Sequence, residues 1–126
     1  MNSYERKLKV EAKHLDDLKH VNNVVYLQWV QETAGMHWFK RAGRDTGVFW
    51  VVRKHEIEYF KPAFENDELR LITWVEEMRG LSSMRRVEIR RGEELICSCL
   101  SNWIMLDAET MRPKRIPDEL AKLFLE

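Results

Sequence analysis

The segment of residues 24–41 restricts the possible folds more than any other part of the chain. It contains no proline, and apolar side chains fall on nearly every face of the helix that it predicts. A helix that is apolar all round must be covered by other structure. We therefore expect it to lie inside the domain, and the RAGRDTG stretch that starts at Arg41 to end it. Its large apolar residues are Val24, Val25, Tyr26, Leu27, Trp29, Val30, Met36, Trp38 and Phe39.

Segments typical of β-strands stand on both sides of this helix in the sequence. Residues 4–12 alternate between charged and apolar side chains, which predicts a first strand. Four longer segments follow the helix, rich in β-branched and aromatic residues, and their short connections favour antiparallel neighbours. They cover residues 48–60, 68–78, 82–91 and 94–106, and the final IPDELAKLFLE predicts a short helix. The expected fold is a single α+β domain, residues 1–126, in which an antiparallel sheet of about five strands wraps around the long helix and covers it on all sides.

Charge and hydropathy exclude several classes of protein. The 126 residues contain 21 acidic and 21 basic side chains, so no net field attracts nucleic acid or an anionic membrane surface. No apolar run reaches the ~20 residues that span a bilayer, and the N-terminus lacks a signal-peptide core. We expect a cytoplasmic protein without a membrane or nucleic-acid partner. The edges of long strands invite pairing with a second copy, which predicts a homodimer or homotetramer.

Polar residues cluster directly before the apolar helix, in the stretch DDLKHVNN. Asn22 or Asn23 is a suitable N-cap, and the free amides of the first helical turn can hold a developing oxyanion. Asp16 lies seven residues before Asn23, close enough for a loop to bring it back beside the helix start. A carboxylate next to such amides suits the hydrolysis of an activated ester or thioester, with Asp16 as nucleophile or general base and His20 in an orienting or assisting role.

Structural explanations for the same residues remain open. An acid or asparagine before a helix is often only a cap, a single histidine is often structural, and Asp17 competes with Asp16 for the catalytic role. His14, Asp16, Asp17 and His20 do not match the spacing of a zinc motif, so we expect neither a metal nor a cofactor. Tyr26 and Trp29 share a helix face and either line an acyl pocket or pack in the core.

Three stretches together resemble one known family. HLDDLKHVNNVVYLQW is similar to the active-site signature of hotdog-fold acyl-CoA thioesterases of the 4-hydroxybenzoyl-CoA thioesterase type. HEIEYFKPAFENDELRLITWV resembles that family's second strand, turn and third strand, and MLDAETMRPKRIPDEL resembles its final strand and tail. The resemblance implies the hotdog fold and active sites built at a dimer interface.

The resemblance also assigns roles to residues of the helix start. It implies Asp16 as the catalytic carboxylate, the backbone amide of Asn23 as the group that polarises the thioester carbonyl, and His20 and Asn22 as residues that shape the site. Two positions depart from the family pattern: His14 stands where members often have an acid, and Lys19 where they have a glycine. That glycine serves a turn that presents the catalytic acid.

The sequence leaves two further functions open, and it does not decide the role of one basic segment. The acyl group is carried either by coenzyme A or by acyl carrier protein, and the same fold can also serve as a non-catalytic acyl-binding module. The MRRVEIRRG stretch either contacts the phosphates of coenzyme A or forms a solvated strand face with acidic neighbours. Its basic residues are Arg85, Arg86, Arg90 and Arg91.

Overall fold

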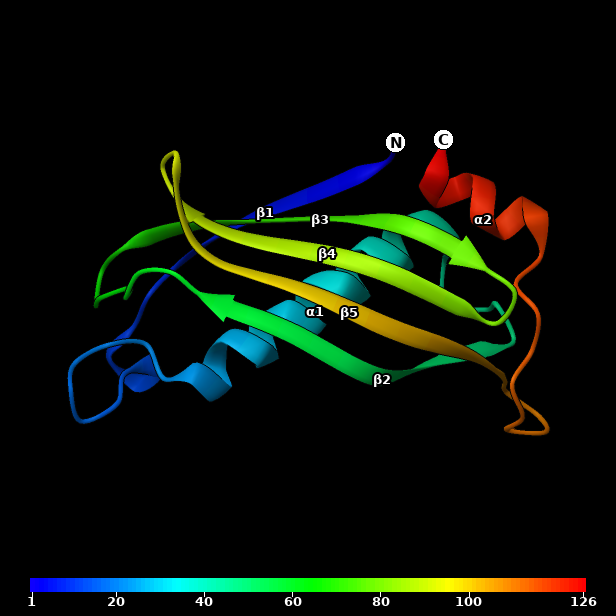
Figure 1. Cartoon of the computed structure of the whole chain (residues 1–126), viewed down its shortest axis with the longest axis horizontal. Coiled ribbons are helices and arrows are strands. Elements are labelled where there is room, and N and C mark those ends of the chain that lie inside the picture. The colour runs from blue at the N-terminus through cyan, green and yellow to red at the C-terminus, as the bar shows by residue number, and fades with distance from the viewer.

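A computed structural model describes all residues of the chain, 1–126, and shows a five-stranded antiparallel sheet curved over one long helix (Figure 1). The two ends of the chain meet, because the Asn2 amide donates to the carbonyl of Phe124. This architecture confirms the predicted α+β class and the order of strand, long helix and four strands. The elements are β1 (Ser3–Lys9), a 3₁₀ turn (Ala12–His14), α1 (Asn23–Ala42), β2 (Val48–Tyr59), β3 (Glu68–Arg79), β4 (Ser82–Arg91), β5 (Glu94–Asp107) and α2 (Asp118–Leu125).

The strands lie in the order β1-β3-β4-β5-β2, so that β1 and β2 form the two edges of the sheet. All four pairings are antiparallel. The registers shift between Val52 and Lys54 in β2 and between Val75 and Glu77 in β3. Such irregularities increase local twist and bend, and they help the sheet to curve over α1.

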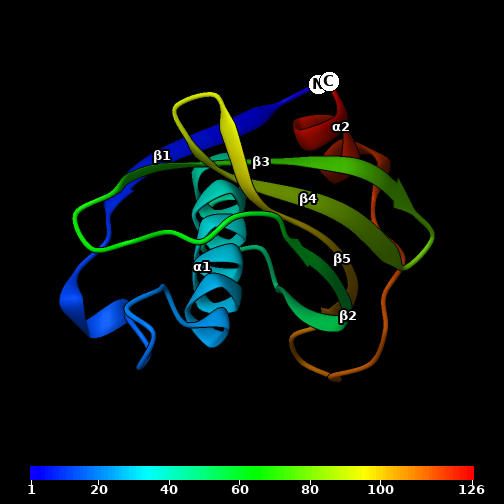
Figure 2. The same cartoon turned by 60° about the vertical axis from the view of Figure 1, so that its left-hand side comes forward.

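The sheet covers only one side of α1, as Figure 2 shows. The expectation that the sheet surrounds the helix on all sides is therefore wrong for the single chain. On the other side, Val24 is 62% exposed and Phe39 is 47% exposed. The physical reason is width: five strands spaced about 4.8 Å apart curve over a helix but do not close around it. The buried residues of the helix are Tyr26, Trp29, Val30, Thr33, Ala34, His37 and Trp38.

The first strand is shorter than predicted. It ends at Lys9 instead of residue 12, because the next residues form a turn in which the Glu11 amide donates to Nδ1 of His14. At the other end of the chain, the predicted short helix is α2, whose Phe124 is fully buried beside Trp38. Neither helix combines the length and apolar character needed to cross a membrane.

Candidate active site at the start of the central helix

The polar loop before α1 folds back on itself as a narrow hairpin. Leu15 and Val21 form an antiparallel bridge. The Asp16 amide donates to the carbonyl of His20 at 2.8 Å, and the Asn22 amide donates to the carbonyl of His14 at 2.9 Å. The expected return of this loop to the helix start is therefore present, and Asp16 belongs to the strand of the hairpin that pairs with the residues entering α1.

The backbone of the loop holds the carboxylate of Asp16 in place. Oδ1 accepts hydrogen bonds from the amides of Leu18, at 2.9 Å, and His20, at 3.3 Å. Oδ2 makes no hydrogen bond within the chain, and the residue is half-buried. Asp17 is exposed and its carboxylate makes no such bonds. Of the two neighbouring acids, only Asp16 therefore has a fixed carboxylate with an oxygen left over for chemistry.

Lys19 occupies the position where the resembled family has a glycine, and it adopts the backbone conformation that glycine favours. Its φ is 64°, in the left-handed region, and its amide donates to the carbonyl of Asp16 at 3.0 Å. A side chain in this region costs roughly 1–2 kcal/mol. The turn that presents Asp16 is thus kept without the glycine, at a local cost in strain.

The start of α1 offers a free amide. The side chain of Asn22 caps the helix by accepting from the Val24 amide at 2.9 Å, as one of the two predicted caps. The amide of Asn23 has no hydrogen-bond acceptor within the chain. Because the helix dipole adds partial positive charge at this end, this N–H can stabilise a negatively charged oxygen. Tyr59 from β2 donates to the Asn23 carbonyl at 3.4 Å and so joins the sheet to the same point.

The ring of His20 packs edge-on against Phe64, with 5.2 Å between centroids, and its nitrogens make no hydrogen bond within the chain. The loop is fixed from the same side by the Val21 amide, which donates to the carbonyl of Ala63 at 2.9 Å. The Pro-Ala turn between β2 and β3 therefore supports the hairpin that carries Asp16. No three side chains of His, Cys, Asp or Glu converge on one point in this region or elsewhere in the chain.

Tyr26 and Trp29 lie in the hydrophobic core, with 3% and 5% of their surfaces exposed. Burial raises the pKa of Tyr26 to about 12. Trp29 contacts the ring of His14 edge-on at 5.0 Å. Trp29 therefore contacts the start of the loop that carries Asp16, and the ring of Tyr26 packs against Trp29. The predicted role of both residues in substrate binding stays a prediction.

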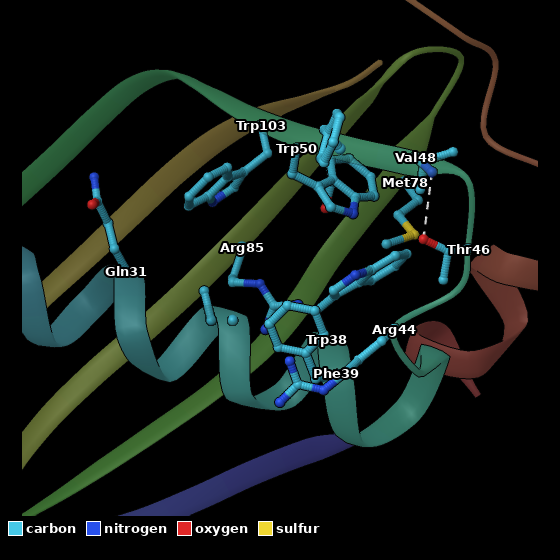
Figure 3. Close-up of a pocket in the computed structure, with 14 residues that line it drawn as sticks. Gln31, Trp38, Phe39, Arg44, Thr46, Val48, Trp50, Met78, Arg85 and Trp103 are labelled. Atoms are coloured by element: carbon cyan, nitrogen blue, oxygen red, sulfur yellow. Dashed lines mark hydrogen bonds between the residues drawn. The ribbon is translucent and has the colours of Figure 1, made fainter. Parts of the chain in front are cut away.

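A cavity of about 320 Å³ lies along the second half of α1, between the helix and the sheet (Figure 3). Its apolar walls include Trp38, Phe49 and Met78. Arg85 extends into this region from β4 and is only 5% exposed. Gln31, the first helix residue of the cavity wall, lies eight residues after Asn23, which corresponds to ~12 Å along the helix.

A buried polar network that the sequence analysis missed borders the cavity. Arg85 Nη1 donates to Nδ1 of His37 at 2.8 Å and to Oγ1 of Thr73 at 3.0 Å. Burial, and then the charge of Arg85, lower the pKa of His37 to about 4. Burial also lowers the pKa of Arg85 to about 10, so its guanidinium stays charged at neutral pH. The period of two in β4 was the available signal, since it places Arg85 on the same face as Val87 and Ile89.

The other arginines of the basic segment lie among acidic neighbours. Arg86 pairs with Glu76 at 3.4 Å, and Arg90 pairs with Glu88 at 3.1 Å, on the face of β4 opposite to Arg85. Arg91 pairs with Asp67 and Glu94. These three residues have the predicted acidic neighbours, and Arg85 is the exception. A contact between this segment and coenzyme A stays a prediction.

Known proteins share both this sequence pattern and this fold. Residues 1–124 match the family described as the acyl-ACP thioesterase N-terminal domain. The long-chain acyl-CoA thioesterase FadM of Escherichia coli is 23% identical in an alignment of 125 positions that covers 92% of each chain. A chloroplastic acyl-[acyl-carrier-protein] hydrolase of Cuphea viscosissima, FATB3, is 31% identical in an alignment of 75 positions that covers 58% of this chain and 18% of that protein.

A solved structure shows the same fold at low sequence identity. The 1,4-dihydroxy-2-naphthoyl-CoA thioesterase Slr0204 of Synechocystis superimposes with a TM-score of 0.83 at 14% identity, over 97% of this chain and 95% of that one. These matches confirm the resemblance to hotdog-fold thioesterases that the three sequence stretches indicated. The chain therefore belongs to the acyl-ACP thioesterase N-terminal domain family and is a thioester hydrolase with the hotdog fold.

Proposed function

We propose that the protein hydrolyses acyl-CoA thioesters to the free acid and coenzyme A, with Asp16 and the Asn23 amide as its catalytic groups. One observation carries the proposal: a carboxylate is held at the turn of a hairpin, and the returning strand of that hairpin leads into the free amide at the helix start. The relative from Escherichia coli, a long-chain acyl-CoA thioesterase that aligns over 92% of the chain, supports coenzyme A as the carrier.

The chemistry follows from the two groups. The thioester carbonyl oxygen accepts a hydrogen bond from the Asn23 amide, and the helix dipole stabilises the charge that develops there. Asp16 then either attacks the carbonyl carbon, forming an anhydride that water hydrolyses, or removes a proton from the water that attacks. In both routes the carbon–sulfur bond breaks, and coenzyme A leaves as the thiolate, which takes up a proton.

The remaining predicted site residues have supporting roles in this proposal. His20 and Asn22 shape the loop end of the site, where the Asn22 cap also orients the first helical turn. Tyr26 and Trp29 form the apolar floor behind the loop. An apolar surrounding strengthens the hydrogen bond to the developing oxyanion, because less water competes for it.

We also propose that the protein works as a homodimer that joins two copies along β2. The other sheet edge, β1, carries charged side chains at Glu5, Lys7 and Lys9, which discourage pairing. The first half of β2 instead exposes Phe49 by 51% and Val51 by 43%. A second copy beside β2 would also cover the side of α1 that the sheet leaves open.

Acyl carrier protein is a second candidate for the carrier. The family that matches residues 1–124, and the relative from Cuphea viscosissima, both carry acyl carrier protein in their names. An assay that offers the same acyl group on coenzyme A and on acyl carrier protein distinguishes the two carriers. A higher kcat/KM for the protein-bound form would assign the carrier to this second candidate.

The experiment that tests the proposed function measures the release of free thiol from a panel of acyl-CoAs. The panel contains short, medium, long and aromatic acyl groups. We expect turnover with a preference among its members. Release from no member of the panel, by protein that is folded according to circular dichroism, would contradict acyl-CoA hydrolysis.

A further inference from the structure

The cavity beside the second half of α1 is lined by cationic and donor groups and by no carboxylate. Arg85 and Arg44 both contribute to its wall, and no Asp or Glu does. Trp50 and Trp103 line the same wall, and their indole nitrogens are buried without a hydrogen-bond partner. In Figure 3 the side chains of Trp50, Trp103 and Arg85 extend from the sheet toward α1. The cavity is therefore suited to a ligand that accepts hydrogen bonds and carries a negative charge.

Arg85 is only partly used by the protein itself. Both of its hydrogen bonds, to His37 and Thr73, come from Nη1. Nε and Nη2 make none within the chain. These two nitrogens lie on the same side of the guanidinium and form the pair that binds the two oxygens of a carboxylate. A structural role toward His37 and Thr73 thus accounts for one nitrogen of three.

The lack of a carboxylate partner sets Arg85 apart from the other arginines that are partly or fully buried. The five partly buried arginines each pair with a carboxylate within 4 Å; they are Arg6, Arg70, Arg86, Arg90 and Arg91. Arg85 is 95% buried and forms no such pair. Burial of an unpaired charge is unfavourable by several kcal/mol, and a bound anion offsets this cost.

We propose that this cavity binds an acyl group whose far end carries a carboxylate, held by Nε and Nη2 of Arg85. The part of this inference that concerns a thioester substrate rests on the proposed function, whereas the carboxylate site does not. The walls formed by Trp38, Phe49 and Met78 suit the carbon chain between the two ends. The volume of about 320 Å³ lies at the lower end of the range of small-molecule sites, roughly 300–1,000 Å³.

The first test measures binding by titration calorimetry, with octanoate and octanol as probes of equal chain length. We expect octanoate to bind the wild-type protein about 10- to 100-fold more tightly than octanol, the range for a charge-assisted hydrogen-bonded pair. Arg85→Met, which keeps an unbranched apolar side chain in the cavity, should abolish this difference. Arg86→Met removes a guanidinium from the opposite face of the same strand and should preserve it.

The second test compares substrates. The mono-CoA ester of decanedioic acid is compared with decanoyl-CoA, and the comparison is repeated with shorter and longer pairs. We expect a higher kcat/KM for the dicarboxylic member at the chain length that reaches Arg85. Arg85→Met should reverse this preference, because it leaves the distal carboxylate without its partner, whereas Arg86→Met should not.

The outcomes separate this inference from the proposed function. Equal binding of octanoate and octanol to the wild-type protein overturns the carboxylate site, even if acyl-CoAs are hydrolysed, and this comparison needs no variant. Tight octanoate binding that depends on Arg85, together with no thiol release, supports the site and contradicts the proposed function. If Arg85→Met does not fold, Arg85→Lys keeps the charge and loses the paired geometry. An unchanged preference for octanoate in Arg85→Lys would then overturn bidentate binding by Nε and Nη2.

Discussion

Arg85 and His37 share a buried hydrogen bond of 2.8 Å, from the guanidinium Nη1 to the ring Nδ1. Because arginine can only donate, Nδ1 of His37 must be unprotonated, and its Nε2 carries the proton that faces Oδ1 of Asn2. A second proton, on Nδ1, would have no hydrogen-bond acceptor and would lie beside the positively charged guanidinium of Arg85. This arrangement gives the fold a dependence on pH.

We expect the free energy of unfolding to fall as the pH is lowered from about 6.5 to about 4. The pKa of His37 is lowered from 6.5 to about 4 in the folded chain, so only the unfolded chain takes up a proton at this residue in that window. Stability is then full above the unfolded value and decreases by on the order of 3 kcal/mol toward the folded value. Urea unfolding at several pH values measures this change.

His37→Gln provides the control for this dependence. Glutamine can accept from Arg85 and donate to Asn2, and it does not titrate. The difference in unfolding free energy between the wild type and the variant should therefore shrink or reverse as the pH falls through the window. A constant difference from pH 7 to pH 4 would contradict the assignment to His37.

Lys19→Gly should stabilise the protein by about 0.5–1 kcal/mol, because glycine adopts a φ of 64° without the steric cost that lysine bears there. Thermal unfolding measures the gain. Asn66→Gly is the matched control, since Asn66 has a φ of 72° and asparagine tolerates this region. The expected gain for that variant is smaller. A loss of stability in Lys19→Gly would show that the Lys19 side chain stabilises the turn.

The proposed homodimer predicts a solution mass of twice 15.2 kDa by light scattering. Val51→Asp should reduce it to the monomer mass at the same concentration, because it places a charge on the β2 edge and brings two like charges close across a two-fold axis. Lys7→Asp changes the other edge of the sheet and should leave the dimer intact. Dissociation by Lys7→Asp and not by Val51→Asp would contradict pairing along β2.

Local patterns in the sequence were sufficient to predict most of the fold. The alternation of residues in β2 to β5 and the apolar run of α1 gave the strands and the helix within a few residues. The end of β1 was misplaced, because the bond from the Glu11 amide to His14 depends on a turn that alternation does not reveal. The exposed side of α1 was also not predicted, since apolar content alone does not tell whether the sheet or a second copy covers a given face.

The candidate site, like the fold, was predictable from the sequence only in part. Asp16 and Asn23 could be named from the sequence because both belong to one short loop and helix start. The network of Arg85, His37 and Thr73 joins residues from β4, α1 and β3, so only the packed fold brings it together. In the sequence, Arg85 stood within a basic run, and only its alternation with Val87 and Ile89 indicated that it faces inward.

The measurement that tests the central claim most directly compares kcat for acyl-CoA hydrolysis in Asp16→Asn and Asp17→Asn. The two variants remove one carboxylate each from adjacent positions, and circular dichroism checks that both fold. We predict a fall of roughly 10²- to 10⁴-fold for Asp16→Asn, the usual contribution of a catalytic acid or base, and a change within about twofold for Asp17→Asn. Full activity in Asp16→Asn, or loss of activity in Asp17→Asn alone, would contradict the assignment of Asp16 as the catalytic carboxylate.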